Sequence, residues 1–222
     1  MSRRLRRALV LGAALLLVLI GGAFAAFALR GSDEPPPPTL SEDRAAATST
    51  ADPAATDYEV VEGGDAFVGY HVREEFAGIG VTNAVGRTPD VSGAATVEED
   101  AITTADLEAD LTTLTSDEER RDNALRDRGI ETARFPDARF VLTEPVDIGR
   151  ERTTATGELT LHGETQPIEV RLSSQRVGDQ IELVGSAPIA FADFDIEPPS
   201  IAGFVTVEDE GTLEFKLRLA PR

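Results

Sequence analysis

The sequence contains no cysteine and no tryptophan, only two histidines, and a single lysine at position 216. Without cysteine, the chain has no disulfide framework, no thiolate metal site, no cysteine nucleophile and no lipid-modified cysteine as an anchor. Basic residues are outnumbered as well, because 21 Lys and Arg face 40 Asp and Glu, for a formal net charge of −19. A charge of this sign repels phosphate backbones, so nucleic acid is not an expected partner.

Charged residues are also missing from a stretch near the N-terminus, residues 8–29. As a helix, this stretch would be roughly 33 Å long, enough to cross the hydrocarbon core of a bilayer. Four arginines precede it within residues 3–7, whereas residues 30–34 carry one arginine and two acids, which places the N-terminus in the cytoplasm. The alternative is a cleaved signal peptide, because residues 23–28 offer small side chains at suitable positions. In both cases the remainder of the chain lies outside the cytoplasm, at the cell membrane or secreted.

The sequence divides into a cytoplasmic stub and membrane helix (1–30), a linker (31–57) and one folded domain (58–222). The linker is rich in Pro, Ala and Thr, with four consecutive prolines at 35–38. We therefore expect a spacer. Its end-to-end distance should be a few tens of ångströms, on the order of 5–6 Å times the square root of its number of residues. Without the five arginines of residues 1–30, 16 basic and 40 acidic residues remain, a net charge of −24. We therefore expect the membrane helix, rather than the domain surface, to hold the protein at the bilayer.

From Tyr58 onward, apolar and polar residues alternate with a period of two, which is typical of β-strands with one wet face. The clearest strand is 213–219, where leucines and a phenylalanine alternate with charged residues. The runs 168–173 and 181–183 flank Gly178-Asp179, a hairpin signal. Shorter alternations occur at 68–72, 91–97, 107–111, 140–142 and 159–161. Roughly eight to ten strands predict an all-β, antiparallel sandwich or barrel.

One segment departs from this pattern and predicts a short helix. Ser116 stands three residues before Glu119, the spacing of a capping box, and acidic residues occupy the first turn. Good helix formers follow, and Gly129 is placed to end the helix before a turn at Pro136.

Three segments resemble the YceI-like family. The first combines residues 114–117, the pair Arg121-Asp122 with Leu125, and the stretch 132–140 with its Phe-Pro turn. The second is the hairpin 155–165, which contains Leu-Thr and His-Gly pairs, and the weaker third is 69–72. The sequence departs from the family pattern at Tyr58, where tryptophan is frequent, at Ala124, where a histidine is common, and at Gly129-Ile130, where a bulky pair is expected.

This resemblance implies an extended, lipocalin-like antiparallel barrel that encloses an apolar cavity and binds a long isoprenoid chain, such as a polyprenyl lipid or a quinone. The residues agree with the shape, because a barrel of about eight strands has an interior just wide enough for side chains or one slender ligand. We therefore expect a non-enzymatic lipid-binding protein. The alternative is a structural or protein-interaction domain whose barrel is filled by side chains; a hydrolase is a remote third.

Catalytic and metal-binding chemistry finds little support in the sequence. His71 is expected to point outward. His162 lies beside Gly163 in a hairpin turn, where we expect its imidazole to hydrogen-bond to the backbone of the turn rather than to act in catalysis. Asp193, Asp195 and Glu197 would share one side of an extended segment, which makes calcium binding conceivable, although a charged loop edge is the preferred interpretation. We expect no catalytic residue, no metal site and no cofactor.

The candidate ligand-binding residues are therefore apolar. Strand parity predicts that one set points into the barrel: Tyr70, Leu107, Leu111, Phe140, Leu142, Leu159, Leu161, Ile168, Val170, Ile181, Leu183, Phe215 and Leu217. A second set is expected to surround an opening: Leu125, Ile130, Phe135, Phe191, Phe194 and Phe204.

Overall fold

The computed structural model describes residues 35–42, 56–76, 80–150, 152–198 and 205–222. The predicted membrane segment lies outside these residues, and none of the helices they form is long and apolar enough to span a bilayer. The elements are β1 (Thr56–Val60), β2 (Phe67–Phe76), β3 (Gly80–Thr88), β4 (Val91–Glu98), β5 (Ala101–Asp110), η1 (Leu111–Thr113), β6 (Thr115–Ser116), α2 (Glu119–Asp127), β7 (Asp137–Leu142), β8 (Val146–Asp147), β9 (Thr153–Leu161), β10 (Glu164–Val177), β11 (Gln180–Ala190), η2 (Phe191–Phe194) and β12 (Val205–Pro221).

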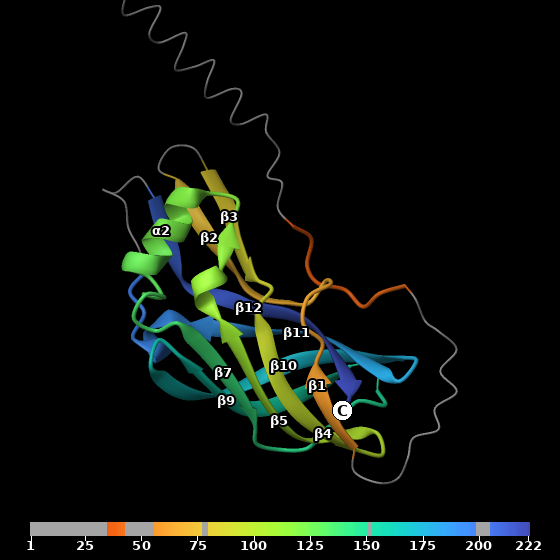
Figure 1. The fold of residues 1–222 in the computed structure, drawn as a ribbon. Coiled ribbons are helices and arrows are strands. Elements are labelled where there is room, and N and C mark those ends of the chain that lie inside the picture. Colours follow the sequence, from red (N-terminus) through yellow and green to blue (C-terminus); the bar gives the residue numbers. More distant parts are fainter. Residues whose placement is uncertain (1–34, 43–55, 77–79, 151, 199–204) are drawn as a thin grey trace, which may run out of the picture. The chain divides into compact units, whose positions relative to one another are not determined.

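Eight antiparallel strands close into a barrel, in the order β1-β4-β5-β7-β9-β10-β11-β12 (Figure 1). Closure depends on β1, which pairs with β4 on one side and with β12 on the other. The seam between β1 and β12 is short and joins Tyr58, Glu59 and Val60 to Pro221, Ala220 and Leu219. The barrel confirms the antiparallel fold that the alternation predicted.

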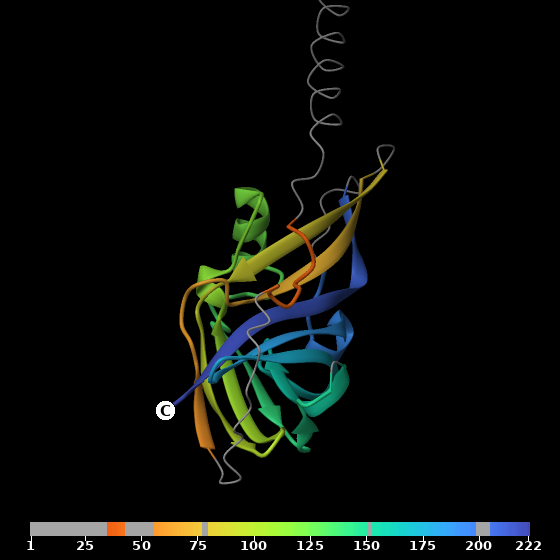
Figure 2. The same ribbon diagram turned by 90° about the vertical axis from the view of Figure 1, so that its right-hand side faces the viewer.

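The long strand β12 belongs to two parts of the sheet. Its C-terminal end closes the barrel against β1, whereas the rest of its length pairs with β2, and β3 and β6 follow beyond β2. A register shift between Val207 and Gly211 interrupts the β12–β2 pairing. The β2–β3 hairpin therefore extends away from the barrel along β12, as Figure 2 shows.

The hairpin predicted at Gly178-Asp179 is confirmed. Strand β10 ends at Val177 and β11 begins at Gln180, which leaves a two-residue turn. Gly178 has φ +67°, a left-handed conformation that glycine adopts without a steric penalty.

The helix forms where it was predicted, but the capping box does not. Helix α2 begins at Glu119 after Glu118, whose side chain makes no capping bond. Ser116 instead pairs with Gly86 of β3 as part of β6, so its backbone is extended, and both its N–H and its hydroxyl donate to Asp122 (2.9 and 2.6 Å). The helix ends at Asp127, and the N–H of Gly129 donates to the carbonyl of Ala124 (3.1 Å).

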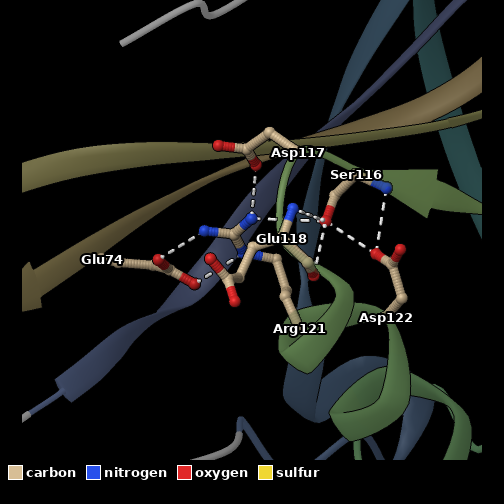
Figure 3. A network of polar contacts seen from close by, with 6 residues as sticks. All are labelled: Glu74, Ser116, Asp117, Glu118, Arg121 and Asp122. Atoms are coloured by element: carbon tan, nitrogen blue, oxygen red, sulfur yellow. Dashed lines mark hydrogen bonds and ion pairs between the residues drawn. The ribbon is translucent and has the colours of Figure 1, made fainter. Parts of the chain in front are cut away.

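Polar contacts fasten α2 to the β2–β3 hairpin (Figure 3). Arg121 donates to both carboxylate oxygens of buried Glu74 on β2 (3.1 Å each) and to Asp117 (2.6 Å). Burial by itself would lower the pKa of Arg121, but the Glu74 carboxylate raises it, so the guanidinium stays charged. None of the nine described residues of α2 is fully buried, so this network replaces apolar packing as its attachment.

Part of the predicted spacer packs on the barrel. We call residues 35–42 the strap. The N–H and hydroxyl of Ser41 both donate to the Glu182 carboxylate (2.9 Å each), and the carbonyl of Pro36 accepts from Arg87 (2.8 Å). With a further hydrogen bond from Gln175, these contacts bring the strap onto β10, β11 and β3.

The outer face of β11 and β12 is consequently not the wet, charged face that alternation predicted. Glu182 is 0% exposed and Glu214 is 5% exposed. Each carboxylate has a cationic partner, Lys216 at 3.2 Å for Glu182 and Arg87 at 2.8 Å for Glu214. The pattern identified charged side chains correctly, but their burial depends on a segment more than a hundred residues away in the chain.

Candidate ligand-binding cavity

The barrel interior holds an apolar cavity of about 100 Å³. Its wall is almost entirely hydrocarbon and is contributed by β2, β4, β5, β7 to β12. Two charged residues, Glu108 and Arg139, also border it, but Arg139 is half-exposed and ion-paired with Asp106 at 2.5 Å. The remaining residues of the wall are Val68, Val91, Ile102, Ala105, Leu107, Ala109, Ala138, Phe140, Leu142, Val146, Ala155, Leu159, Ile168, Val170, Leu172, Leu183, Leu213, Phe215 and Leu217.

Strand parity identified about half of this wall. The predicted residues that border the cavity are Leu107, Phe140, Leu142, Leu159, Ile168, Val170, Leu183, Phe215 and Leu217. The missed residues include four alanines on the same faces of β5, β7 and β9, such as Ala105 and Ala109 beside Leu107, and three valines on β2, β4 and β8. Parity applied to every position of β5, β7 and β9 would have found the alanines, whose small side chains leave the space that the cavity occupies.

Several inward-facing candidates do not border the cavity. Ile181 is fully buried in the barrel core. Leu111 lies beyond the end of β5, because the Asp110 side chain accepts from the Thr112 N–H and starts the 3-10 helix η1. Tyr70 lies over Gly86 of β3, close to the charged residues of α2, and burial raises the pKa of its hydroxyl.

The residues predicted to surround an opening divide into two groups. Leu125 on α2 packs against Gly129, the Phe135 ring lies over Gly163 in the β9–β10 turn, and Ile130 is partly buried; none of these three residues borders the cavity. Phe191 and Phe194 belong to a cluster around η2. Phe204 lies outside the described residues.

The η2 cluster packs directly behind one part of the wall. Its buried members are Leu159, Ile189, Phe194 and Ile196, and Leu161, Phe191, Ile168 and Leu213 pack against them. Leu159, Ile168 and Leu213 also border the cavity. The two phenylalanines and Leu161 therefore support the wall rather than form it.

His162 holds η2 in place. It is buried in the turn between β9 and β10; its Nδ1 lies 3.0 Å from the Phe194 carbonyl oxygen and its Nε2 lies 3.0 Å from a Glu131 carboxylate oxygen. The Phe135 ring packs against it, with 4.4 Å between ring centroids. The imidazole of His162 thus hydrogen-bonds to a backbone group, as expected, but this group belongs to η2 and not to the turn that contains His162. Both ring nitrogens face acceptors, a geometry that holds the imidazole in place.

The acidic trio does not share one side of an extended segment. Asp193 lies within the 3-10 helix η2, and Asp195 has φ +52°, a left-handed conformation that ends the turn. Alternation therefore fails here, and all three side chains are exposed. Among the described residues, no three His, Asp or Glu side chains are grouped so that they could hold a metal ion.

A closed eight-stranded antiparallel barrel with an apolar interior is a lipocalin-like architecture. The chain belongs to the YceI-like family, because the model of the YceI-like domain matches residues 50–219.

Relatives and solved structures agree with this assignment. The chain is 32% identical over 106 residues to a UPF0312 protein of Vibrio parahaemolyticus, which covers 45% of this chain and 56% of that protein. It is 29% identical over 128 residues to a UPF0312 protein of Shewanella denitrificans, covering 54% and 67%. The chain thus spans little more than half the length of the Vibrio relative.

Two solved structures share the fold. A polyisoprenoid binding domain from Saccharophagus degradans, implicated in plant cell wall breakdown, aligns with a TM-score of 0.58 and 19% identity over 74% of this chain and 98% of that one. BcnA of Burkholderia cenocepacia aligns with a TM-score of 0.55 and 16% identity, covering 68% and 95%.

Proposed function

We propose that this protein holds a long apolar lipid of the isoprenoid type inside its barrel, as a membrane-anchored binding protein outside the cytoplasm. The observation that carries the proposal is the cavity, whose wall consists of aliphatic and phenylalanine side chains from nearly every strand of the barrel. Such a wall offers burial of hydrocarbon and almost no hydrogen-bonding groups, which suits an isoprenoid better than a sugar or a nucleotide. The fold shared with a polyisoprenoid binding domain supports the same ligand class.

The size of the cavity sets a condition on binding. An engineered cavity of about 150 Å³ holds benzene, so a cavity of about 100 Å³ takes a long chain only when wall side chains move. The energy balance allows this. Burying the five carbons of one isoprene unit contributes about 4 kcal/mol at about 0.8 kcal/mol per carbon, whereas an off-rotamer side chain costs about 0.5–1.5 kcal/mol. Each buried unit therefore offsets the displacement of two or three side chains.

The test is extraction of the full-length protein with organic solvent, followed by mass spectrometry of the extract. We expect a stoichiometric isoprenoid lipid, and Leu107→Glu, which places a charge in the wall, should abolish its recovery. Thr104→Glu is the matched control, because it places the same charge at an exposed position of the same strand outside the cavity wall, and it should retain the lipid. Empty extracts, together with no uptake of added farnesol, geranylgeraniol or solanesol, would overturn the proposal.

The small volume also favours a second candidate function, a structural or protein-interaction domain whose barrel is filled. A crystal structure of protein incubated with geranylgeraniol separates the two. Electron density for geranylgeraniol among Phe140, Leu159 and Phe215 would support the lipid-binding function. An unchanged interior with rings in their present places supports the filled barrel.

The membrane placement rests on the apolar residues 8–29 and the arginines before them. Alkaline carbonate extraction of membranes should leave the protein in the pellet; a soluble protein whose N-terminus begins after residue 23 would indicate a cleaved signal instead.

A further inference from the structure

Two glycines on the inner side of the barrel lie beneath the only aromatic rings in the described wall of the cavity. Gly185 on β11 pairs directly with Phe215 on β12, and Gly157 on β9 lies diagonally across from Phe140 on β7. A β-carbon placed on Gly185 would lie 2.4 Å from Cζ and 2.6 Å from Cε1 of Phe215. One placed on Gly157 would lie 2.4 Å from Cε2 and Cζ of Phe140. Both rings therefore lie against backbone, in space that the β-carbon of any other residue would occupy.

The backbone conformation of these strands does not explain the glycines. Neither Gly157 nor Gly185 has a positive φ, so any residue could adopt their conformation. Glycine inside a strand also weakens it, because it loses more conformational entropy on folding and packs no side chain. The remaining requirement at both positions is space for the ring.

We infer that Gly157 and Gly185 determine how much of the barrel interior is open to ligand, by allowing Phe140 and Phe215 to lie along the wall. The inference rests on the proposed lipid-binding function and names the residues that set its capacity. A ring raised from the wall would occupy much of the interior, because the cavity measures only about 100 Å³ and a benzene-sized group needs space of about that order. The glycines would thus limit the bulk and length of the bound chain.

Gly185 is the better test position. A β-carbon on Gly157 would also meet the carbonyl oxygen of Val141 at 2.6 Å, so alanine there would disturb the backbone. On Gly185 the close contacts are with the Phe215 ring, and the nearest backbone atom, the Arg171 carbonyl oxygen, lies at 3.0 Å. The matched control is Gly86, where a β-carbon would lie 2.4 Å from the Tyr70 ring although neither residue borders the cavity.

The experiment measures dissociation constants of the full-length protein for geraniol, farnesol, geranylgeraniol and solanesol by equilibrium dialysis. Gly185→Ala should bind the longer alcohols about tenfold more weakly. Overpacking of this kind costs about 1.4 kcal/mol, which corresponds to a factor of ten in the dissociation constant. Gly86→Ala should leave all four constants unchanged. Phe215→Ala should strengthen binding of the longer alcohols, and adding Gly185→Ala to Phe215→Ala should have no further effect, because the displaced ring is gone.

The outcomes separate this inference from the proposed function. If the unsubstituted protein binds none of the alcohols, the lipid-binding function fails. If it binds them and Gly185→Ala binds them equally well, or if Gly185→Ala weakens binding to the same extent with and without the Phe215 ring, the role of the glycine fails alone. Should Gly185→Ala not fold, Phe215→Ala still decides: unchanged constants in that variant would overturn the inference.

Discussion

At the scale of single residues, glycines and aromatic rings are matched across the sheet. Among the described residues, rings lie over glycines at five places: Tyr70 over Gly86, Phe135 over Gly163, Phe140 over Gly157, Phe191 over Gly211 and Phe215 over Gly185. A ring over a strand glycine shields the exposed backbone and recovers packing that the missing side chain would have supplied. In a protein with only ten Phe, two Tyr and no Trp, this arrangement accounts for much of the aromatic content.

The ionisation of Glu182 depends strongly on the tertiary structure. Burial by itself would raise its pKa, but hydrogen bonds from Ser41, Gln175 and Lys216 lower it from 4.5 to about 2. A carboxylate with a depressed pKa stabilises the fold at every pH above its unfolded value, and this contribution is lost as the pH falls from about 4.5 toward 2.

We therefore expect Glu182→Gln to lower the free energy of unfolding at neutral pH, by up to about 3 kcal/mol. The difference from the unsubstituted protein should shrink between pH 4.5 and 2, as measured by chemical denaturation at each pH. Asp106→Asn is the control, because Arg139 also lowers the pKa of Asp106 but the pair is exposed, so its effect should be much smaller. A constant difference across this pH range would show that Glu182 contributes by shape rather than by charge.

At the scale of elements, polar contacts hold both the strap and α2: the strap contacts β10, β11 and β3, and α2 contacts β2. Gln175 of β10 donates to the Ser41 carbonyl (2.9 Å) and to Glu182 (2.6 Å), so the strap completes a network that begins within the sheet. Arg87 similarly joins Pro36 to Glu214 and lies 4.0 Å from the centre of the Phe67 ring. The strap thus covers Glu182, and α2 covers Glu74.

Replacing residues 35–42 with a Gly-Ser segment of equal length should destabilise the domain by about 1–3 kcal/mol, because Glu182 loses both Ser41 hydrogen bonds. Hydrogen exchange should show faster exchange in the β10–β11 hairpin, whereas amides of β7 should be unaffected. Equal protection of β11 in both proteins would contradict a structural role for the strap.

At the scale of the whole molecule, the barrel exists because β1 joins β4 to β12. The seam with β12 contains three residue pairs, and an ion pair between Arg222 and Glu59 lies beside it. A closed barrel has no free strand edge there, and its lumen persists only while this short seam holds.

A cross-link across the seam tests closure directly, and the absence of native cysteine makes it unambiguous. Glu59 and Ala220 are paired residues on antiparallel strands, whose Cα spacing of about 4.5–5.5 Å suits a disulfide. The double variant Glu59→Cys, Ala220→Cys should cross-link under oxidising conditions and gain about 2–4 kcal/mol of stability relative to its reduced form. Each single variant is the control, and failure to cross-link would contradict the closed seam.

The sequence by itself determined most of the strands, although β1 and β3 were not predicted. The alternation at 213–219 and the turn at Gly178-Asp179 act locally, since side-chain parity and turn conformation depend on neighbouring residues. The short helix followed from helix-forming residues and a glycine end in the same way. About half of the cavity wall was predictable from parity, because all inward positions of a barrel share one face of the sheet.

Only the tertiary structure decided the rest. Ser116 was expected to cap the helix but lies in β6, because pairing with β3 fixes its backbone. The strap has a linker-like composition yet covers Glu182, and the side chain of His162 reaches Phe194 and Glu131, about thirty residues away on either side. These contacts join residues distant in the chain, so no local pattern encodes them; they arise when folding of the whole domain brings the partners within hydrogen-bonding distance.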